Sequence, residues 1–264
     1  MMKMTMMTGL LICVAITGMA VAEEPIGIDV SLDFNSKYVW RGQNLVDDWV
    51  FQPGVSLTYD SFTFGIWGNS DMTGAAADLA GARNEDFEFT EWDYYADYSG
   101  TVPDMEWLGY SIGVINYQFP GGAADTTEVY VGLSVDTVLS PSVTAYFDVD
   151  EAEGTYISFG VSHSVDEIAS IDENTPIGMD MSLSIGWGDS NYNEFYWTSP
   201  AVVDSSGLND LTLQFAFPIP VGSWTITPSL NYVTLLSDDI RNNSAGYSED
   251  NDFFYAGVGI ATSF

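Results

Sequence analysis

The residues best able to do chemistry in this sequence are a small set of charged side chains on alternating positions. Lys37 and Arg41 are two of only five basic residues in a chain that has 38 acidic ones. At the period of two that a β-strand imposes, both fall on one face with Asp33. The polar faces of later strands supply the other members: Glu91, Asp93, Asp97 and Glu128. Such charges either pair with one another or filter solutes by charge.

Both interpretations of this charge cluster stay open at the level of sequence. A charge that faces a confined interior loses solvation, so opposite charges are expected to pair and to fill the interior as a plug. Narrow barrels commonly fill their interiors with side chains, which favours the plug. The alternative is a constriction that selects ions, as rings of acidic side chains do in cation pathways.

Catalytic chemistry has little support. His163 is the only histidine, and a serine or aspartate nucleophile would need such a base within reach. It shares its row with the apolar residues Ile157, Phe159 and Val161, near the expected periplasmic end. We therefore expect an interfacial, non-catalytic histidine. Phosphate loops, zinc-type clusters and nucleophile elbows are absent from the sequence, which predicts neither an enzyme nor a cofactor.

Metal binding has only weak candidates in two acidic stretches near the C-terminus. Carboxylates there offer the hard oxygen ligands that Ca²⁺ and Mg²⁺ prefer. Neither stretch has the EF-hand spacing, so a solvated acidic surface is the expected state. The candidate ligands are Asp238, Asp239, Glu249, Asp250 and Asp252.

Strands have to position all of these residues, because apolar and polar residues alternate along most of the chain. The apolar row of the first strand, for example, consists of Ile28, Val30, Leu32, Phe34, Tyr38 and Trp40. The same pattern recurs near 51–59, 88–98, 129–135, 179–187, 211–217, 224–232 and 254–260. Alternation of this kind indicates strands. About twelve are expected, an even number typical of single-chain bacterial barrels. The predicted fold is all-β: one antiparallel, up-and-down transmembrane β-barrel.

A soluble β-sandwich would also alternate, but two features favour a membrane barrel. Many apolar rows carry aromatic residues near their ends, and the opposite rows are small and polar. Connections near 60–61, 136–141 and 218–222 look short, with longer ones on the same side at 99–107 and 165–176. The other side has long polar loops at 69–86, 188–207 and 236–251.

Both ends of the chain indicate export. Residues 1–22 read as a secretory signal peptide cleaved after Ala22, which leaves residues 23–264 as one barrel domain. Cleavage would remove Cys13, the only cysteine. The last strand ends on Phe264 with Gly259 five residues earlier, a pattern typical of the signal read by the outer-membrane assembly machinery, although Thr262 stands where an apolar residue is usual. The expected surroundings are outer-membrane lipid.

The strong acidity also limits the possible partners. The formal net charge is −33 at pH 7. A nucleic-acid partner is not expected, because phosphate binding needs a basic surface. Small cations or other small solutes remain the expected ligands.

Several segments resemble the Gcw_chp family of bacterial exported proteins. Residues 36–42 read Ser-Lys-Tyr-Val-Trp-Arg-Gly, close to the strand with which that family typically opens. Segments 65–68, 91–99, 113–117 and 127–134 are similar in order and spacing, although Trp92 stands where the family tends to have a smaller aliphatic residue. The resemblance implies an outer-membrane barrel without a settled biochemical role.

Two functional hypotheses follow from the sequence. The first is a porin-like passive channel for small solutes, biased toward cations by the acidic interior. The alternative is a closed structural or surface-interaction barrel whose acidic outer loops meet ions. An open or a blocked interior would separate them.

Overall fold

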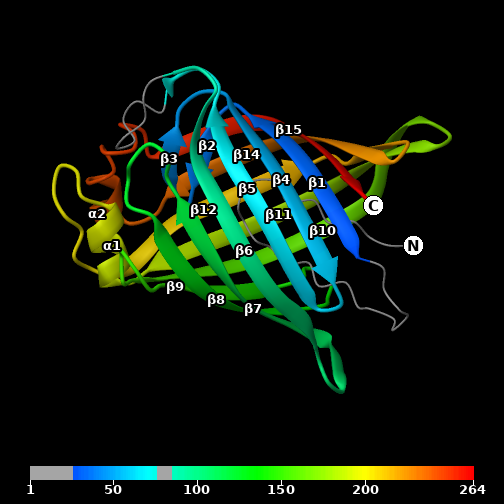
Figure 1. Ribbon diagram of the computed structural model, residues 1–264, viewed down its shortest axis with the longest axis horizontal. Coiled ribbons are helices and arrows are strands. Elements are labelled where there is room, and N and C mark those ends of the chain that lie inside the picture. The colour runs from blue at the N-terminus through cyan, green and yellow to red at the C-terminus, as the bar shows by residue number, and fades with distance from the viewer. Residues whose placement is uncertain (1–25, 76–84) are drawn as a thin grey trace.

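Twelve antiparallel strands close into a barrel in the computed structural model, which describes residues 26–75 and 85–264 (Figure 1). The ring closes where the first strand pairs with the last. The strands are β1 (Gly27–Asn35), β4 (Val50–Tyr59), β5 (Phe62–Asp71), β6 (Glu88–Val102), β7 (Met105–Gln118), β8 (Thr126–Val135), β9 (Ser142–Asp148), β10 (Thr155–Asp172), β11 (Thr175–Gly188), β12 (Gly207–Ala216), β14 (Trp224–Leu235) and β15 (Asp252–Ser263). The predicted fold class and strand number are confirmed. The predicted signal peptide, residues 1–22, lies outside the described residues.

Five short elements complete the described part of the chain. The strands β2 (Tyr38–Trp40) and β3 (Gln43–Val46) form a separate hairpin, and β13 (Ile219–Val221) adds to the edge of β14. Helices α1 (Ser190–Tyr196) and α2 (Asp238–Arg241) lie in two of the long loops. Within the described residues, no helix has both the length and the apolar character needed to cross a membrane.

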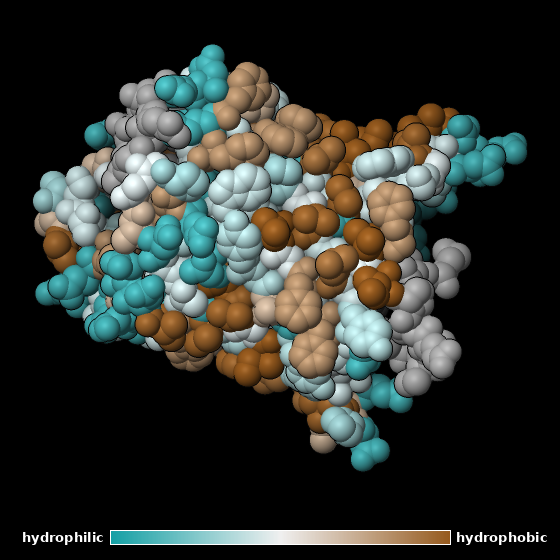
Figure 2. All heavy atoms as spheres, viewed as in Figure 1, coloured by the Kyte–Doolittle hydropathy of each residue, from teal (hydrophilic) through white to brown (hydrophobic). Residues whose placement is uncertain are grey.

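The outer surface of the barrel is apolar around its middle. Side chains on the outward rows are strongly exposed, for example Val129, Val131 and Leu133 of β8. Figure 2 shows hydrophobic residues over the strands and hydrophilic residues gathered toward the ends. Water-soluble proteins rarely expose an apolar surface of this extent. An apolar band facing outward is the arrangement of transmembrane barrels.

The first strand begins and the last strand ends at the same end of the barrel, as an even number of strands requires. Ile28 and Phe264 exchange two backbone hydrogen bonds there. The helices and long loops lie at the opposite end (Figure 1). We call the first the terminal end and the second the loop end.

The predicted longer connections at 99–107 and 165–176 are wrong. Strands β6 and β7 stay paired to Val102 and Met105, and β10 and β11 stay paired to Asp172 and Thr175. Turns of two residues, 103–104 and 173–174, close these hairpins. Neighbouring antiparallel strands can extend their ladder past the barrel wall, and polar residues in them then read as a loop in the sequence.

Candidate functional site: the hairpin inside the barrel

The first predicted strand does not run as far as the sequence pattern suggests. Tyr38 and Trp40 were expected on its outward apolar row, with Lys37 and Arg41 on the inward one. Instead β1 ends at Asn35, and residues 36–49 fold into the interior as the β2–β3 hairpin. Tyr38 and Trp40 are buried there. Apolar and polar residues keep alternating from β1 into the hairpin, so this period alone could not reveal that the chain turns into the interior after Asn35.

A two-residue turn forms the tip of this hairpin. Arg41 and Gly42 have φ angles of 47° and 84°, and both positive values belong to the turn type that suits a tight hairpin. A Cβ on Gly42 would lie 2.7 Å from Cδ2 of Leu235 and 2.9 Å from Cβ of Asp210. Position 42 thus needs glycine for its conformation and for its fit against β12 and β14.

Arg41 ties the hairpin tip to the barrel wall. Its Nη1 and Nη2 donate to the two carboxylate oxygens of Glu128 at 2.7 and 2.8 Å. The guanidinium also stacks on the rings of Tyr146 and Tyr156, 4.3 and 4.4 Å from their centroids, and on Trp40. The Arg41 and Glu128 side chains are 7% and 1% exposed. Two aligned hydrogen bonds and several ring faces offset the cost of burying both charges.

Tyrosine hydroxyls extend this network to the neighbouring strands. Tyr38 donates to Glu91 at 2.8 Å, and Tyr117 donates to Glu128 at 2.9 Å. Ring contacts join Tyr38 to Trp67 and Trp40 to Tyr117. The hairpin therefore packs against β5 to β10, and we call this side of the hairpin the packed side.

The structure brings together part of the predicted charge cluster. Arg41, Glu91 and Glu128 meet on the packed side, and Asp93 is fully buried on the inward row of Glu91. Asp97 lies farther along that row and accepts a hydrogen bond from Tyr130 at 2.7 Å.

Lys37 and Asp33 are placed away from that group. Lys37 pairs with Asp47 at the base of the hairpin, and Asp47 is mostly exposed. Asp33 is buried on β1, opposite Gln52 of β4 and Gly259 of β15. The seven predicted residues thus form one buried acidic group around Arg41 and two separate sites.

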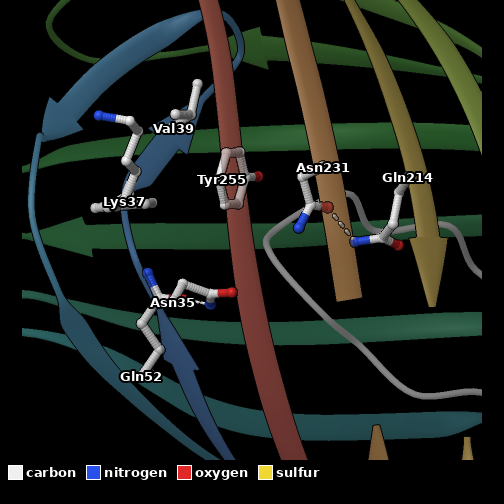
Figure 3. Close-up of a pocket in the computed structure, with 8 residues that line it drawn as sticks. Asn35, Lys37, Val39, Gln52, Gln214, Asn231 and Tyr255 are labelled. Atoms are coloured by element: carbon white, nitrogen blue, oxygen red, sulfur yellow. Dashed lines mark hydrogen bonds between the residues drawn. The ribbon is translucent and has the colours of Figure 1, made fainter. Parts of the chain in front are cut away.

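A polar recess borders the other side of the hairpin (Figure 3). The space between its lining atoms, open solvent included, is about 260 Å³. The lining comes from β1, the hairpin, β4, β12, β14 and β15: Asn35, Lys37, Tyr38, Val39, Gln52, Gln214, Asn231 and Tyr255. Asn35 donates to Gln52 at 2.9 Å, and Gln214 donates to Asn231 at 2.8 Å. Uncharged amides dominate this side, in contrast to the carboxylates of the packed side.

Some residues of the site were missed by sequence reasoning. Tyr156 donates to Asp210 at 2.8 Å, and the ring of Tyr192 in α1 lies 5.9 Å from the Arg41 guanidinium. The segment containing Tyr192 read as a polar loop. The signal that could have found the site is the series of tyrosines on otherwise polar inward rows, since a large ring in that position needs something to pack against.

The weak metal candidates lie in the loops at the loop end. Asp238 and Asp239 open α2, and Asp252 accepts a hydrogen bond from Tyr232 at 2.9 Å. Within residues 26–75 and 85–264, no group of three or more acidic, histidine or cysteine side chains is arranged to hold a metal ion. Beside them Trp197, Leu235, Ile240 and Tyr247 pack into a small core, and burial raises the pKa of the Tyr247 hydroxyl above its usual range.

The remaining predicted residues lie near the terminal end. His163 Nδ1 is 2.8 Å from the carbonyl oxygen of Val138, far along β10 from the charged group around Arg41. Gly259 faces Asp33 across the β1–β15 pair, and Phe264 is largely exposed.

Comparisons with known proteins agree with this architecture. The model of the family described as "Bacterial protein of unknown function (Gcw_chp)" matches residues 19–244. LpxR from Salmonella typhimurium has a similar structure, with a TM-score of 0.52 at 11% identity over 89% of this chain and 99% of that one. The KdgM porin (TM-score 0.49, 8% identity, 90% and 99% covered) and the NanC porin (0.49, 12%, 89% and 98%) also match. A comparison with curated proteins finds no match. At 11% identity the likeness to LpxR shows the barrel fold alone.

Proposed function

The chain belongs to the Gcw_chp family, and from that premise we propose that it is an integral outer-membrane barrel that acts as a passive, cation-preferring channel for small solutes. The apolar outward rows support a lipid environment, and the closed ring leaves no strand edge in hydrocarbon. The proposal includes removal of residues 1–22 and recognition of the strand end at Gly259 and Phe264 by the assembly machinery.

The proposed orientation follows from the two ends of the barrel. Short turns and both chain termini belong on the periplasmic side of outer-membrane barrels, and long loops belong outside. The terminal end is therefore the periplasmic end in this proposal. The hairpin then enters the interior from the cell exterior, and residues 36–49 are an outer loop folded inward.

The cation preference rests on the charges of the interior. Glu91, Asp93 and Glu128 surround a single guanidinium, that of Arg41, on the packed side. Asp33 and Asp97 add negative charge nearer the periplasm. A low-dielectric wall strengthens the field of such charges and raises the local concentration of cations. Acidic side chains in cation pathways act in this way.

The observation that carries the proposal is a change in the size of the inward side chains, which are small toward the periplasm and large where the hairpin fills the interior. Toward the periplasm the inward rows are small and polar, for example Ser158, Gly160 and Ser162 on β10. At the hairpin the same rows carry Tyr156 and Glu128. The hairpin, rather than the wall, therefore limits passage.

Planar-bilayer conductance of a shortened chain tests the proposal. Replacing residues 37–48 by a short Gly-Ser turn should raise single-channel conductance several-fold, because the wall left behind is wide and polar. The matched control shortens the β7–β8 loop at residues 121–124, which lies outside the hairpin. An absence of conductance steps above background in the hairpin-shortened protein contradicts the channel.

A closed surface barrel is the second candidate, favoured by how tightly the loop end is packed. The buried Arg41–Glu128 pair and the loop core around Trp197 are the packed contacts that support it. This candidate gives the acidic outer loops the main role, with weak binding of divalent cations at Asp238 and Asp239. It predicts no conductance in the wild type, and calorimetric Ca²⁺ binding that the double variant D238N/D239N loses.

A hydrolytic function has no place in either candidate. His163 lies at the periplasmic end, where its ring contacts a backbone carbonyl. We expect the variant His163→Ala to lose no activity when the purified protein is incubated with outer-membrane lipid. Hydrolysis by the wild type that the variant lacks would contradict this expectation.

A further inference from the structure

The two sides of the hairpin offer very different resistance to a solute. On the packed side Tyr38, Trp40 and Arg41 contact six consecutive strands through rings and charged hydrogen bonds. On the other side the tip fits against β12 and β14 at Gly42, and away from the tip the structure leaves the recess between residues 35–39 and strands β12, β14 and β15. Figure 3 shows the side chains of Gln214, Asn231 and Tyr255 on one side of that recess and Asn35, Lys37 and Val39 on the other.

The wall of the recess is mostly made of uncharged polar side chains. Asn35, Gln52 and Asn231 are buried, and their amides offer both donors and acceptors. Lys37, the one charged residue among the lining side chains, is paired with Asp47. An ion in this recess would meet amide oxygens that can replace part of its hydration shell.

Asp33 lies next along the same route toward the periplasm. It occupies the inward position of β1 two residues before Asn35, and it is 3% exposed. Its Oδ1 accepts no hydrogen bond from the described residues. Its partner position on β15 is Gly259, and Gly257 faces Asn35 in the same way, so the β15 wall has no side chains there. A buried carboxylate with an unused oxygen is stabilised by a nearby cation.

We propose that small cations cross the outer half of the barrel through this recess, beside the hairpin, and that Asp33 makes the passage cation-selective. The inference rests on the proposed channel function and adds the route and the selecting residue. The Arg41–Glu128 pair then keeps the hairpin in place and leaves the recess as the narrow part of the pathway.

Reversal potentials in planar bilayers test the selecting residue. Under a KCl gradient the wild type should show a cation-selective potential, and Asp33→Asn should shift it toward zero. The matched control is Asp180→Asn, on the inward row of Ser182 and Ser184 in the small-residue half. It removes the same charge where the interior is not narrowed, so its potential should stay near that of the wild type. Equal potentials in the two variants would overturn the role of Asp33.

Thiol labelling tests the route independently of Asp33. Cys13 is the only natural cysteine and is expected to leave with the signal peptide, so Gln214→Cys would be a unique thiol. A cationic methanethiosulfonate reagent should then abolish most of the conductance. The control Ser162→Cys lies in the small-residue half and should retain most of it. Complete labelling of Gln214→Cys without a loss of conductance would overturn the route.

The conductance of the wild type separates failure of this inference from failure of the channel itself. Wild-type conductance that complete labelling of Gln214→Cys leaves unchanged would refute a passage beside the hairpin, while the channel function stands. Absence of conductance from the wild type would refute the channel function, and conductance in the hairpin-shortened protein alone would identify the hairpin as a plug.

Discussion

The loop-end and terminal-end halves of the interior are built by the same twelve strands, but their inward side chains differ in size. In the proposed orientation they are the outer and the periplasmic half. On β8, Glu128 and Tyr130 in the outer half are followed by Gly132 and Ser134 toward the periplasm. On β15, Tyr255 in the outer half is followed by glycines at 257 and 259. The outward rows show no such change, because lipid contacts both halves alike.

The difference teaches what a barrel of this width needs in order to close. The interior of a barrel of about eight strands is just wide enough for side chains to fill, and a twelve-stranded barrel has a wider interior. In the outer half, large wall residues alone would not meet at the centre, so a chain segment enters and the tyrosines pack against it. The periplasmic half has small inward residues, and none of the segments that the structure describes enters it. Closure here is therefore local, and variants in the two halves should have unequal effects.

The largest effect is expected from Arg41→Ala. The variant leaves Glu128 buried without its partner, which costs about 3 to 5 kcal/mol in comparable sites. We expect a loss of that size in the free energy of unfolding, measured by denaturant titration with tryptophan fluorescence in lipid vesicles, together with higher conductance. The control Arg241→Ala breaks a 3.6 Å contact with the half-exposed Asp252 and a 2.8 Å hydrogen bond to the carbonyl oxygen of Leu235, and it should cost roughly 1 to 2 kcal/mol, less than Arg41→Ala. Equal losses would mean that the outer half is not held by its buried pair.

Two glycines with positive φ give a sharper test of the same contrast. Gly42 (φ 84°) meets Leu235 and Asp210, whereas Gly222 (φ 66°) sits in a periplasmic turn with open space around it. Gly222→Ala should cost only the backbone strain, about 1 to 2 kcal/mol. Gly42→Ala adds a collision inside a packed interior and should cost at least about 1 kcal/mol more and weaken the seating of the hairpin. Thermal unfolding followed by circular dichroism measures both, and similar losses would argue against a tightly seated tip.

The sequence was sufficient for the barrel because its outward rows obey one physical rule throughout. Every strand must present apolar residues to lipid at alternate positions, so rows such as Val129, Val131 and Leu133 can be recognised from the sequence. The same rule predicted inward positions for Asp33, Glu91 and Glu128, where the structure places them.

The hairpin could not be predicted in the same way. Its own residues alternate, so Tyr38 and Trp40 appeared to continue β1 toward lipid. Only long-range contacts decide that they turn inward, and Arg41 meets its partner Glu128 across 87 positions of sequence. The identity of the pair follows from the fold and not from local spacing. Tyrosines on inward rows were the available hint, but their partners lie on other strands.

A smaller effect is expected from Tyr130→Phe, at the boundary between the two halves. Tyr130 is buried and donates to Asp97 at 2.7 Å, so losing its hydroxyl should cost about 1 kcal/mol. The matched control Tyr232→Phe removes a 2.9 Å hydrogen bond to Asp252 at the exposed surface, where water replaces the partner. In denaturant titration, Tyr130→Phe should lose more free energy of unfolding than Tyr232→Phe. The reverse order would show that burial at this boundary does not strengthen the network.

The smallest effect is expected from Lys37→Gln, although Lys37 and Arg41 looked alike in the sequence. Lys37 pairs with Asp47, which is mostly exposed, at the wet base of the hairpin. Surface pairs of this kind contribute roughly 0 to 1 kcal/mol, because water screens both charges and the long side chain loses freedom on pairing. The free energy of unfolding should therefore change by less than about 1 kcal/mol in the vesicle assay used for Arg41. A loss as large as that of Arg41→Ala would mean that the base, and not the tip, holds the hairpin inside the barrel.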